Sequence, residues 1–124
     1  MVLVDTSVWL RYFRNQAPYG DELDRLVDLK EAAGHDLIYG ELLMGDPGGL
    51  RGFIAEYSLL RPTATIAHDE VVGLVNTRHL HGRGVGWIDV NLVASAIAAR
   101  SQLWTADRNL HTIALELGIA YTAR

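Results

Sequence analysis

The sequence predicts an α/β protein with a small central parallel sheet flanked by helices. Short apolar runs, of which Val2-Leu3-Val4 is the first, alternate with longer segments whose apolar residues recur at helical spacing. Strands separated by helices pair in parallel through right-handed crossovers, which place helices on the faces of the sheet. The length of 124 residues is enough for one buried core, so residues 1–124 are predicted to form a single domain.

The first part of the chain is predicted to contain two strands and four helices. Asp5-Thr6-Ser7 supplies side-chain oxygens that can cap a helix after the first strand. Asp36 is predicted to cap the third helix, and Pro47-Gly48-Gly49 is predicted to form a turn. The expected elements are a strand over residues 2–5, helices over residues 7–14, 21–34, 36–46 and 50–57, and a brief strand at residues 59–60.

The second part continues this alternation and adds a glycine-rich loop. Apolar residues from Ile66 to Leu80 recur at helical spacing, and HGRGVGW is predicted to be a loop before a helix that begins at Asp89. Trp9 and Trp104 lie beside apolar runs and are predicted in the core. The remaining elements are predicted as a strand over residues 102–105, a helix over 107–117 and a closing strand over 119–121.

The composition excludes several classes of protein. There is no cysteine, so a disulfide framework and a zinc-thiolate site are impossible, and a metal must bind through oxygen or imidazole. The net charge of −4 argues against a protein that coats nucleic acid by bulk charge. No apolar run approaches the ~20 residues that span a bilayer, and the first residues lack the basic region of a signal peptide. We therefore expect a cytoplasmic protein with no membrane partner.

Four acidic residues are candidates for a common site. Asp5 follows the first strand and Asp107 follows a later one, so both are expected at the carboxyl edge of the sheet, where ligands bind in this architecture. Asp89 and Glu41 lie on helices that could converge on the same edge. Each acid taken alone has a structural interpretation: the aspartates could cap helices for about 1 kcal/mol each, and the glutamate could be a solvated helix residue. The shared edge favours a functional site.

Carboxylates gathered in this way repel one another unless a cation neutralises them. Mg²⁺ and Mn²⁺ are hard cations that take oxygen ligands and keep several waters for substrate phosphates. Held here, such an ion can activate water, orient a phosphodiester and stabilise the leaving oxygen. The sequence thus indicates phosphoryl chemistry that depends on Mg²⁺ or Mn²⁺.

Four blocks of the sequence resemble PIN-domain ribonucleases of the VapC type, the toxins of bacterial toxin–antitoxin pairs. They are VLVDTSVWLRYFR, GELLMGD, GRGVGWIDVNLVASA and LWTADRNL, in the order and spacing of that family. A lone DTS would be weak evidence, whereas four ordered blocks over nearly the whole chain are specific.

This resemblance implies a PIN-like fold and a metal-dependent endoribonuclease that cuts RNA, in many members a structured RNA such as a tRNA. It also implies a cognate VapB-type antitoxin that inhibits the enzyme, and a homodimer. The three aspartates are assigned to metal coordination, directly or through water, and the glutamate to a ligand through water or to positioning the attacking water. The implied catalytic residues are Asp5, Glu41, Asp89 and Asp107.

Two hydroxyls and two arginines are candidates for contact with the substrate. Thr6 and Thr105 neighbour the acids in the sequence. Arg83 lies among glycines that allow close approach to a phosphate, although a flexible connector is an equally good interpretation of the same segment. Arg11 follows the first helix away from Asp5, where it could contact RNA or the acids of an inhibitory partner. The histidines are isolated and receive no catalytic role.

Three other functions stay open. A binding module could keep the fold and retain the acids as caps, and it would show little affinity for metal. A receiver-like phosphoacceptor also has an aspartate at a strand end, but it needs a lysine near a later strand, and Lys30 falls within a predicted helix. A DNA nuclease or a phosphatase would use similar metal chemistry; the chain is small for a flap nuclease and has no DxDxT motif.

Overall fold

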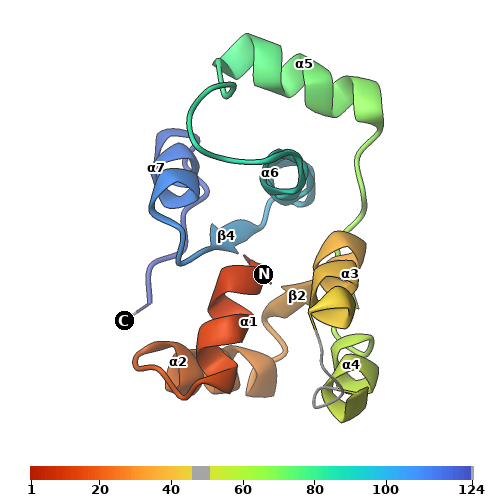
Figure 1. Ribbon diagram of the computed structural model, residues 1–124, viewed down its shortest axis with the longest axis vertical. Coiled ribbons are helices and arrows are strands. Elements are labelled where there is room, and N and C mark those ends of the chain that lie inside the picture. The colour runs from red at the N-terminus through yellow and green to blue at the C-terminus, as the bar shows by residue number, and fades with distance from the viewer. Residues whose placement is uncertain (46–50, 124) are drawn as a thin grey trace.

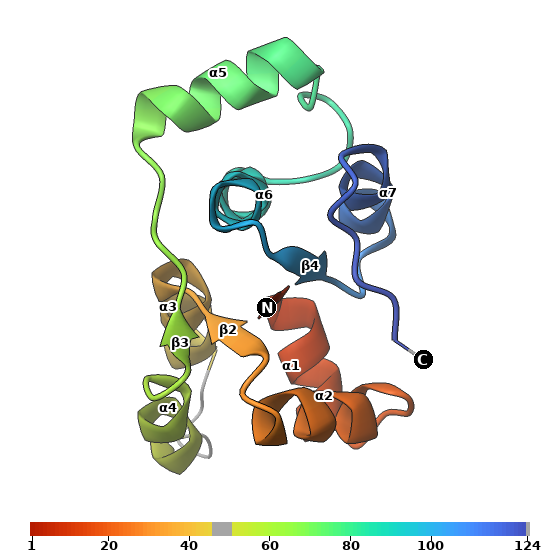
Figure 2. The same cartoon turned by 180° about the vertical axis from the view of Figure 1, so that it is seen from behind.

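A four-stranded parallel sheet lies at the centre of the fold, as the computed structural model shows (Figures 1 and 2). The structure describes residues 1–45 and 51–123. The strands lie in the order β3-β2-β1-β4, and every pairing is parallel. They are β1 (Val2–Val4), β2 (Ala32–Gly34), β3 (Arg61–Pro62) and β4 (Gln102–Trp104). The predicted α/β class is therefore confirmed.

Helices cover this sheet on both sides. Figure 1 shows α5, α6 and α7 on one side of the strands and α1 and α2 on the other. No helix in the described residues has the length and apolar character needed to cross a bilayer. The helices are α1 (Thr6–Phe13), α2 (Tyr19–Asp28), α3 (Asp36–Met44), α4 (Arg51–Tyr57), α5 (His68–Arg78), α6 (Trp87–Ala99) and α7 (Arg108–Glu116).

The central strand β1 is buried along its whole length. Leu3 pairs with Ala33 on one side and with Leu103 on the other. A parallel sheet with helices on both faces needs such a continuous apolar strand, because neither face meets water. Trp9 and Trp104 are also buried, as the sequence predicts. The core therefore lies directly behind the carboxyl end of β1, where the first candidate acid follows.

The helix predicted over residues 21–34 is wrong in its second half. The α2 helix ends at Asp28, and Lys30 then takes a left-handed conformation with a φ of 58°. The chain continues into β2, whose three small residues are all buried. Such a short strand gives no periodic signal of its own, since what defines it is the pairing with β1.

Other boundaries differ by smaller amounts. The strand expected at residues 59–60 lies two residues later, as β3, and α6 begins at Trp87, two residues before Asp89. The closing strand expected over residues 119–121 is wrong, because its pairing is reduced to one parallel bridge between Leu103 and Ala120. The turn predicted at residues 47–49 lies outside the described residues.

His35, and not Asp36, caps the helix that carries Glu41. The imidazole is buried, and its Nδ1 accepts a hydrogen bond from the N–H of Leu37 at 3.0 Å. Because Nδ1 accepts, the ring hydrogen lies on Nε2, which donates to the Ser95 hydroxyl at 2.9 Å. Neutral His35 thus joins the start of α3 to the buried side of α6.

The cap makes stability depend on pH. Burial lowers the pKa of His35 below its ordinary 6.5, against the opposing charge of Asp36. The unfolded chain therefore binds a proton at this residue before the folded chain does, and the free energy of unfolding should fall as the pH drops through about 6.5. His35→Asn keeps a capping acceptor and should lose this part of the pH dependence. Urea unfolding of the wild type and of His35→Asn between about pH 7.5 and pH 5.5 measures this difference. Equal pH dependence of the two proteins would contradict the role of neutral His35 as the cap.

Candidate active site

Asp5 directly follows β1 and is buried, with 6% of the residue exposed. Its N–H donates to the carbonyl of Trp104 at 2.9 Å, so pairing with β4 extends to this residue. The carboxylate Oδ2 accepts hydrogen bonds from the hydroxyls of Ser7 at 2.7 Å and Thr105 at 2.9 Å. Both bonds fall on one oxygen, which leaves Oδ1 without a donor among the described residues.

The same two hydroxyls also hold the loop after β4. Ser7 Oγ accepts a hydrogen bond from the N–H of Ala106, and Thr105 Oγ1 accepts one from the N–H of Asp107, both at 3.0 Å. Each hydroxyl therefore donates to Asp5 and accepts from the loop. Ser7 is absent from the predicted site residues, although the Asp-x-Ser spacing at a helix start is the signal that could have identified it.

Glu41 reaches the same edge of the sheet from α3. It is half-buried, and its Oε1 accepts a hydrogen bond from the Thr6 hydroxyl at 2.7 Å. Burial raises the pKa of Glu41, and the charges of Asp5 and Asp89 raise it further, while the bond from Thr6 opposes the shift. The three carboxylates thus lie within electrostatic reach of one another.

Asp89 and Asp107 complete the cluster. Asp89 Oδ2 accepts a hydrogen bond from the N–H of Gly86, and Asp107 Oδ1 accepts one from the N–H of Leu110, both at 2.9 Å. Burial raises the pKa of Asp89 despite the bond from Gly86, and the charges of Asp5 and Asp107 raise it further. The structure therefore brings all four predicted acids into one acidic cluster, linked by charge.

Helix capping explains only part of this cluster. Asp107 caps α7, and Asp89 binds the amide that precedes α6. Asp5 precedes α1 but makes no side-chain cap bond, since its carboxylate points to two hydroxyls. Across residues 1–45 and 51–123, no three acidic or histidine side chains lie close enough to hold one metal ion as they stand. Each carboxylate of the cluster points to a donor of its own.

Each of the two candidate arginines has a partner within the protein. Both terminal nitrogens of Arg83 bind the carboxylate of Glu116 on α7, at 2.8 and 2.7 Å. Arg11 donates to the carbonyl of Ser7 at 3.0 Å, and its guanidinium lies 5.7 Å from the ring centroid of Tyr19. Arg11 is thus held beside the acidic cluster, whereas Arg83 is tied to α7. Contact of either residue with a substrate stays a prediction.

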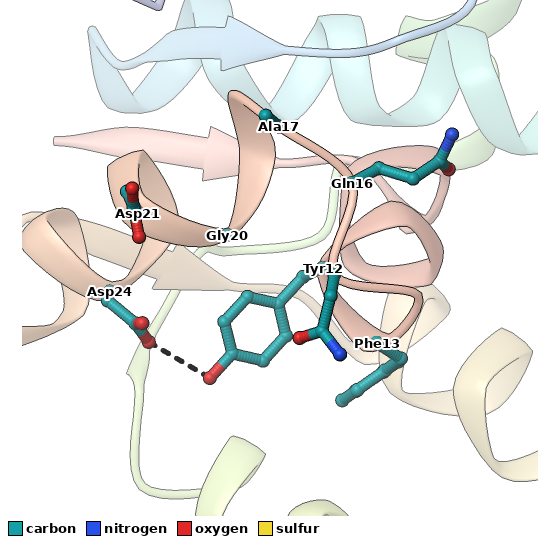
Figure 3. Close-up of a pocket in the computed structure, with 8 residues that line it drawn as sticks. Tyr12, Phe13, Gln16, Ala17, Gly20, Asp21 and Asp24 are labelled. Atoms are coloured by element: carbon teal, nitrogen blue, oxygen red, sulfur yellow. Dashed lines mark hydrogen bonds between the residues drawn. The ribbon is translucent and has the colours of Figure 1, made fainter.

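A cavity of about 380 Å³ lies between the end of α1 and the start of α2 (Figure 3). The Tyr12 hydroxyl donates to Asp24 at its rim, at 2.9 Å. Burial and this carboxylate raise the pKa of Tyr12. None of the four candidate acids lines the cavity, so it is not part of the candidate active site.

Solved structures show the same architecture. The chain is similar to PAE2754 from Pyrobaculum aerophilum, a crystal structure, with a TM-score of 0.58 and 17% identity over 94% of each chain. No family model matches the sequence. This likeness to PAE2754 shows the fold, a parallel sheet covered by helices of the PIN-like class.

Curated relatives identify the family within this class. The chain is 37% identical over 124 residues to Ribonuclease VapC32 of Mycobacterium tuberculosis, in both strain CDC 1551 / Oshkosh and strain H37Rv. The match covers 97% of this chain and 95% of the relative. The chain therefore belongs to the VapC family, which confirms the resemblance seen in the four sequence blocks.

Thr105→Val tests the network that holds Asp5. The substitution keeps the shape of the side chain but removes a donor to Asp5 and an acceptor for the Asp107 amide. We expect a loss of about 1–3 kcal/mol in the free energy of unfolding, measured in urea. Thr112→Val is the matched control, because the exposed Thr112 hydroxyl binds only a carbonyl of its own helix and should change stability by less than about 0.5 kcal/mol. Equal effects would contradict the network.

Glu41→Gln tests the electrostatic cost of the cluster. The folded state disfavours charged Glu41, whose pKa is raised by burial and by Asp5 and Asp89. The variant should therefore unfold at a higher temperature than the wild type at neutral pH, and the gain should vanish as the pH falls below the ordinary pKa of 4.5. Glu31→Gln, at an exposed position, should show no such gain. A Glu41→Gln variant less stable than the wild type at neutral pH would refute the arrangement.

Proposed function

We propose that this protein is a metal-dependent endoribonuclease that acts as a toxin by cleaving cellular RNA through water attack on a phosphodiester. The observation that carries the proposal is the gathering of four carboxylates at one sheet edge, in a chain 37% identical to a protein named Ribonuclease VapC32. A structured RNA such as a tRNA is the proposed target.

The donor chemistry of the cluster fits Mg²⁺ or Mn²⁺. Carboxylate oxygens are the ligands that these cations prefer, and the chain has no thiolate to offer in their place. Asp5, Asp89 and Asp107 are the residues that would hold the ion, with Oδ1 of Asp5 lacking a protein donor among the described residues. When bound, such an ion supplies a Lewis acid that polarises the phosphodiester and favours the ionisation of water.

The protein side chains have distinct roles in this proposal. Glu41, with its pKa raised, is better matched than an ordinary glutamate to accepting a proton from the attacking water near neutral pH. Thr6 fixes Glu41 through Oε1, which leaves Oε2 for the water. Thr105 and Ser7 orient Asp5 without neutralising it, so the negative charge that attracts a cation is preserved.

RNA cleavage by purified protein is the direct test. Wild-type protein should cut total RNA with Mg²⁺ or Mn²⁺ and not with EDTA. Asp89→Asn should lower the rate more than about a hundredfold, since even outer-shell partners of a metal site are worth about 10- to 100-fold. Asp28→Asn, which neutralises an exposed acid at the end of α2, should cleave like the wild type. Intact RNA under every condition would favour a binding module over an enzyme.

Metal binding can be measured without activity. A bound cation relieves the repulsion among the carboxylates, so Mn²⁺ at about a hundredfold excess over its Kd should stabilise the wild type by ~2.7 kcal/mol. The gain should be smaller in Asp89→Asn, and differential scanning fluorimetry measures both. A melting temperature that millimolar Mn²⁺ leaves unchanged would count against the metal.

We extend the proposal to two partners, a cognate VapB-type antitoxin and a second copy of this chain. Expression of the protein alone should arrest growth, and co-expression of a small neighbouring gene should restore it. Growth that continues with wild-type protein and with Asp89→Asn alike would argue against a toxin. Light scattering of the purified protein measures whether it is a dimer.

A further inference from the structure

A second cavity, of about 300 Å³, adjoins the acidic cluster on the β4 side. Thr105 and Asp107 line it, so it opens directly beside the proposed catalytic residues. Its other walls come from the loop before α2, from α7 and from the segment after α7, which Figure 2 shows descending beside that helix. The cavity therefore extends the acidic site along the surface.

Two basic side chains form part of this wall. Arg108 and His111 both line the cavity, and in the described part of the chain neither has a side-chain hydrogen bond or an ion pair. Arg108 is exposed and directly follows Asp107. Arg83, by contrast, is bound at both terminal nitrogens by Glu116. Arg108 thus has a guanidinium without a side-chain partner in the described part of the chain, whereas Arg11 donates to the Ser7 carbonyl, so Arg108 is the better candidate to bind a phosphate near the acids.

Aromatic rings form another part of the cavity wall. Tyr19 and Tyr121 both pack on Trp104, with ring centroids 5.9 and 5.4 Å apart. The Tyr121 hydroxyl donates to Glu22 at 3.1 Å and accepts from Arg25 at 3.2 Å, which anchors the segment after α7 to α2. Such a wall is already ordered before a ligand arrives.

We propose that this cavity binds a nucleotide that flanks the scissile phosphate in a single-stranded part of the RNA. Arg108 contacts a phosphate oxygen, and the base lies against His111 and the tyrosines. Unpaired bases are recognised by stacking on aromatic and histidine rings, whereas a base inside a duplex cannot enter such a site. The volume is at the lower end of small-ligand sites, which suits one nucleotide. The inference rests on the proposed ribonuclease function and adds substrate contacts outside the acidic cluster.

Binding of a short single-stranded RNA, followed by fluorescence anisotropy in the Asp89→Asn background, tests the cavity. Arg108→Gln should weaken binding about tenfold and reduce the slope of log affinity against log salt by about 0.7, the value for one phosphate contact on a single strand. His111→Ala should weaken binding roughly five- to a hundredfold, as expected for the loss of a stacking contact, with little change in this slope.

Arg78→Gln is the matched control. Arg78 is also exposed, but it lines a cavity with Gln102 at the opposite end of β4, so it should alter affinity by less than about twofold. In the wild-type background, Arg108→Gln should raise KM for RNA more than it lowers kcat. Circular dichroism checks that each variant is folded.

The outcomes separate this proposal from the one on which it rests. Suppose that Asp89→Asn binds RNA and the wild type cleaves it, but Arg108→Gln and His111→Ala bind as tightly as Arg78→Gln. The cavity is then not a nucleotide site, and the proposed ribonuclease function is unaffected. If the wild-type protein neither binds nor cleaves RNA, the proposed function fails and the nucleotide site fails with it.

Discussion

The carboxylate of Asp5 is the group on which the arrangement of the site depends. It stands where the central strand ends, and its backbone still pairs with β4. Through Ser7 and Thr105 it connects the start of α1 to the loop that carries Asp107. A buried charge needs such donors, because an unsatisfied carboxylate would cost several kcal/mol. The hydrogen bonds that offset the cost of burying the Asp5 carboxylate also hold the end of β1 close to the end of β4.

Neutral donors, not cations, hold the acidic cluster. In residues 1–45 and 51–123 the ion pairs lie within α2 and between Arg83 and α7, so none of the four acids is paired with a basic side chain. Hydroxyl and amide donors stabilise a carboxylate but leave its charge in place. Burial and mutual repulsion consequently raise the pKa of both Glu41 and Asp89. Such perturbation in a cluster is typical of functional sites.

The fold was predictable where local pattern and tertiary structure agree. The β1 run and the apolar spacing of α1 and α5 identify those elements without reference to the rest of the chain. The β2 strand could not be found in this way, because Ala32, Ala33 and Gly34 are small and the strand exists through its pairing with β1. The reverse error occurred at residues 119–121, where an apolar run suggests a strand but one bridge to Leu103 is all that forms.

The same distinction between local pattern and tertiary contact applies to the candidate site. The four acids could be listed from the sequence because strand ends and helix starts place them, and these are local features. The partners of the basic residues depend on contacts between distant segments. Arg83 looks accessible among its glycines, yet its partner Glu116 lies 33 positions away. Arg108 directly follows Asp107, and this neighbourhood in the sequence suggests an ion pair between them. In the structure, the Asp107 carboxylate instead accepts a hydrogen bond from the amide of Leu110. An arginine is available to a phosphate only if no nearby carboxylate binds it. The partner of each carboxylate can be identified only in the folded chain.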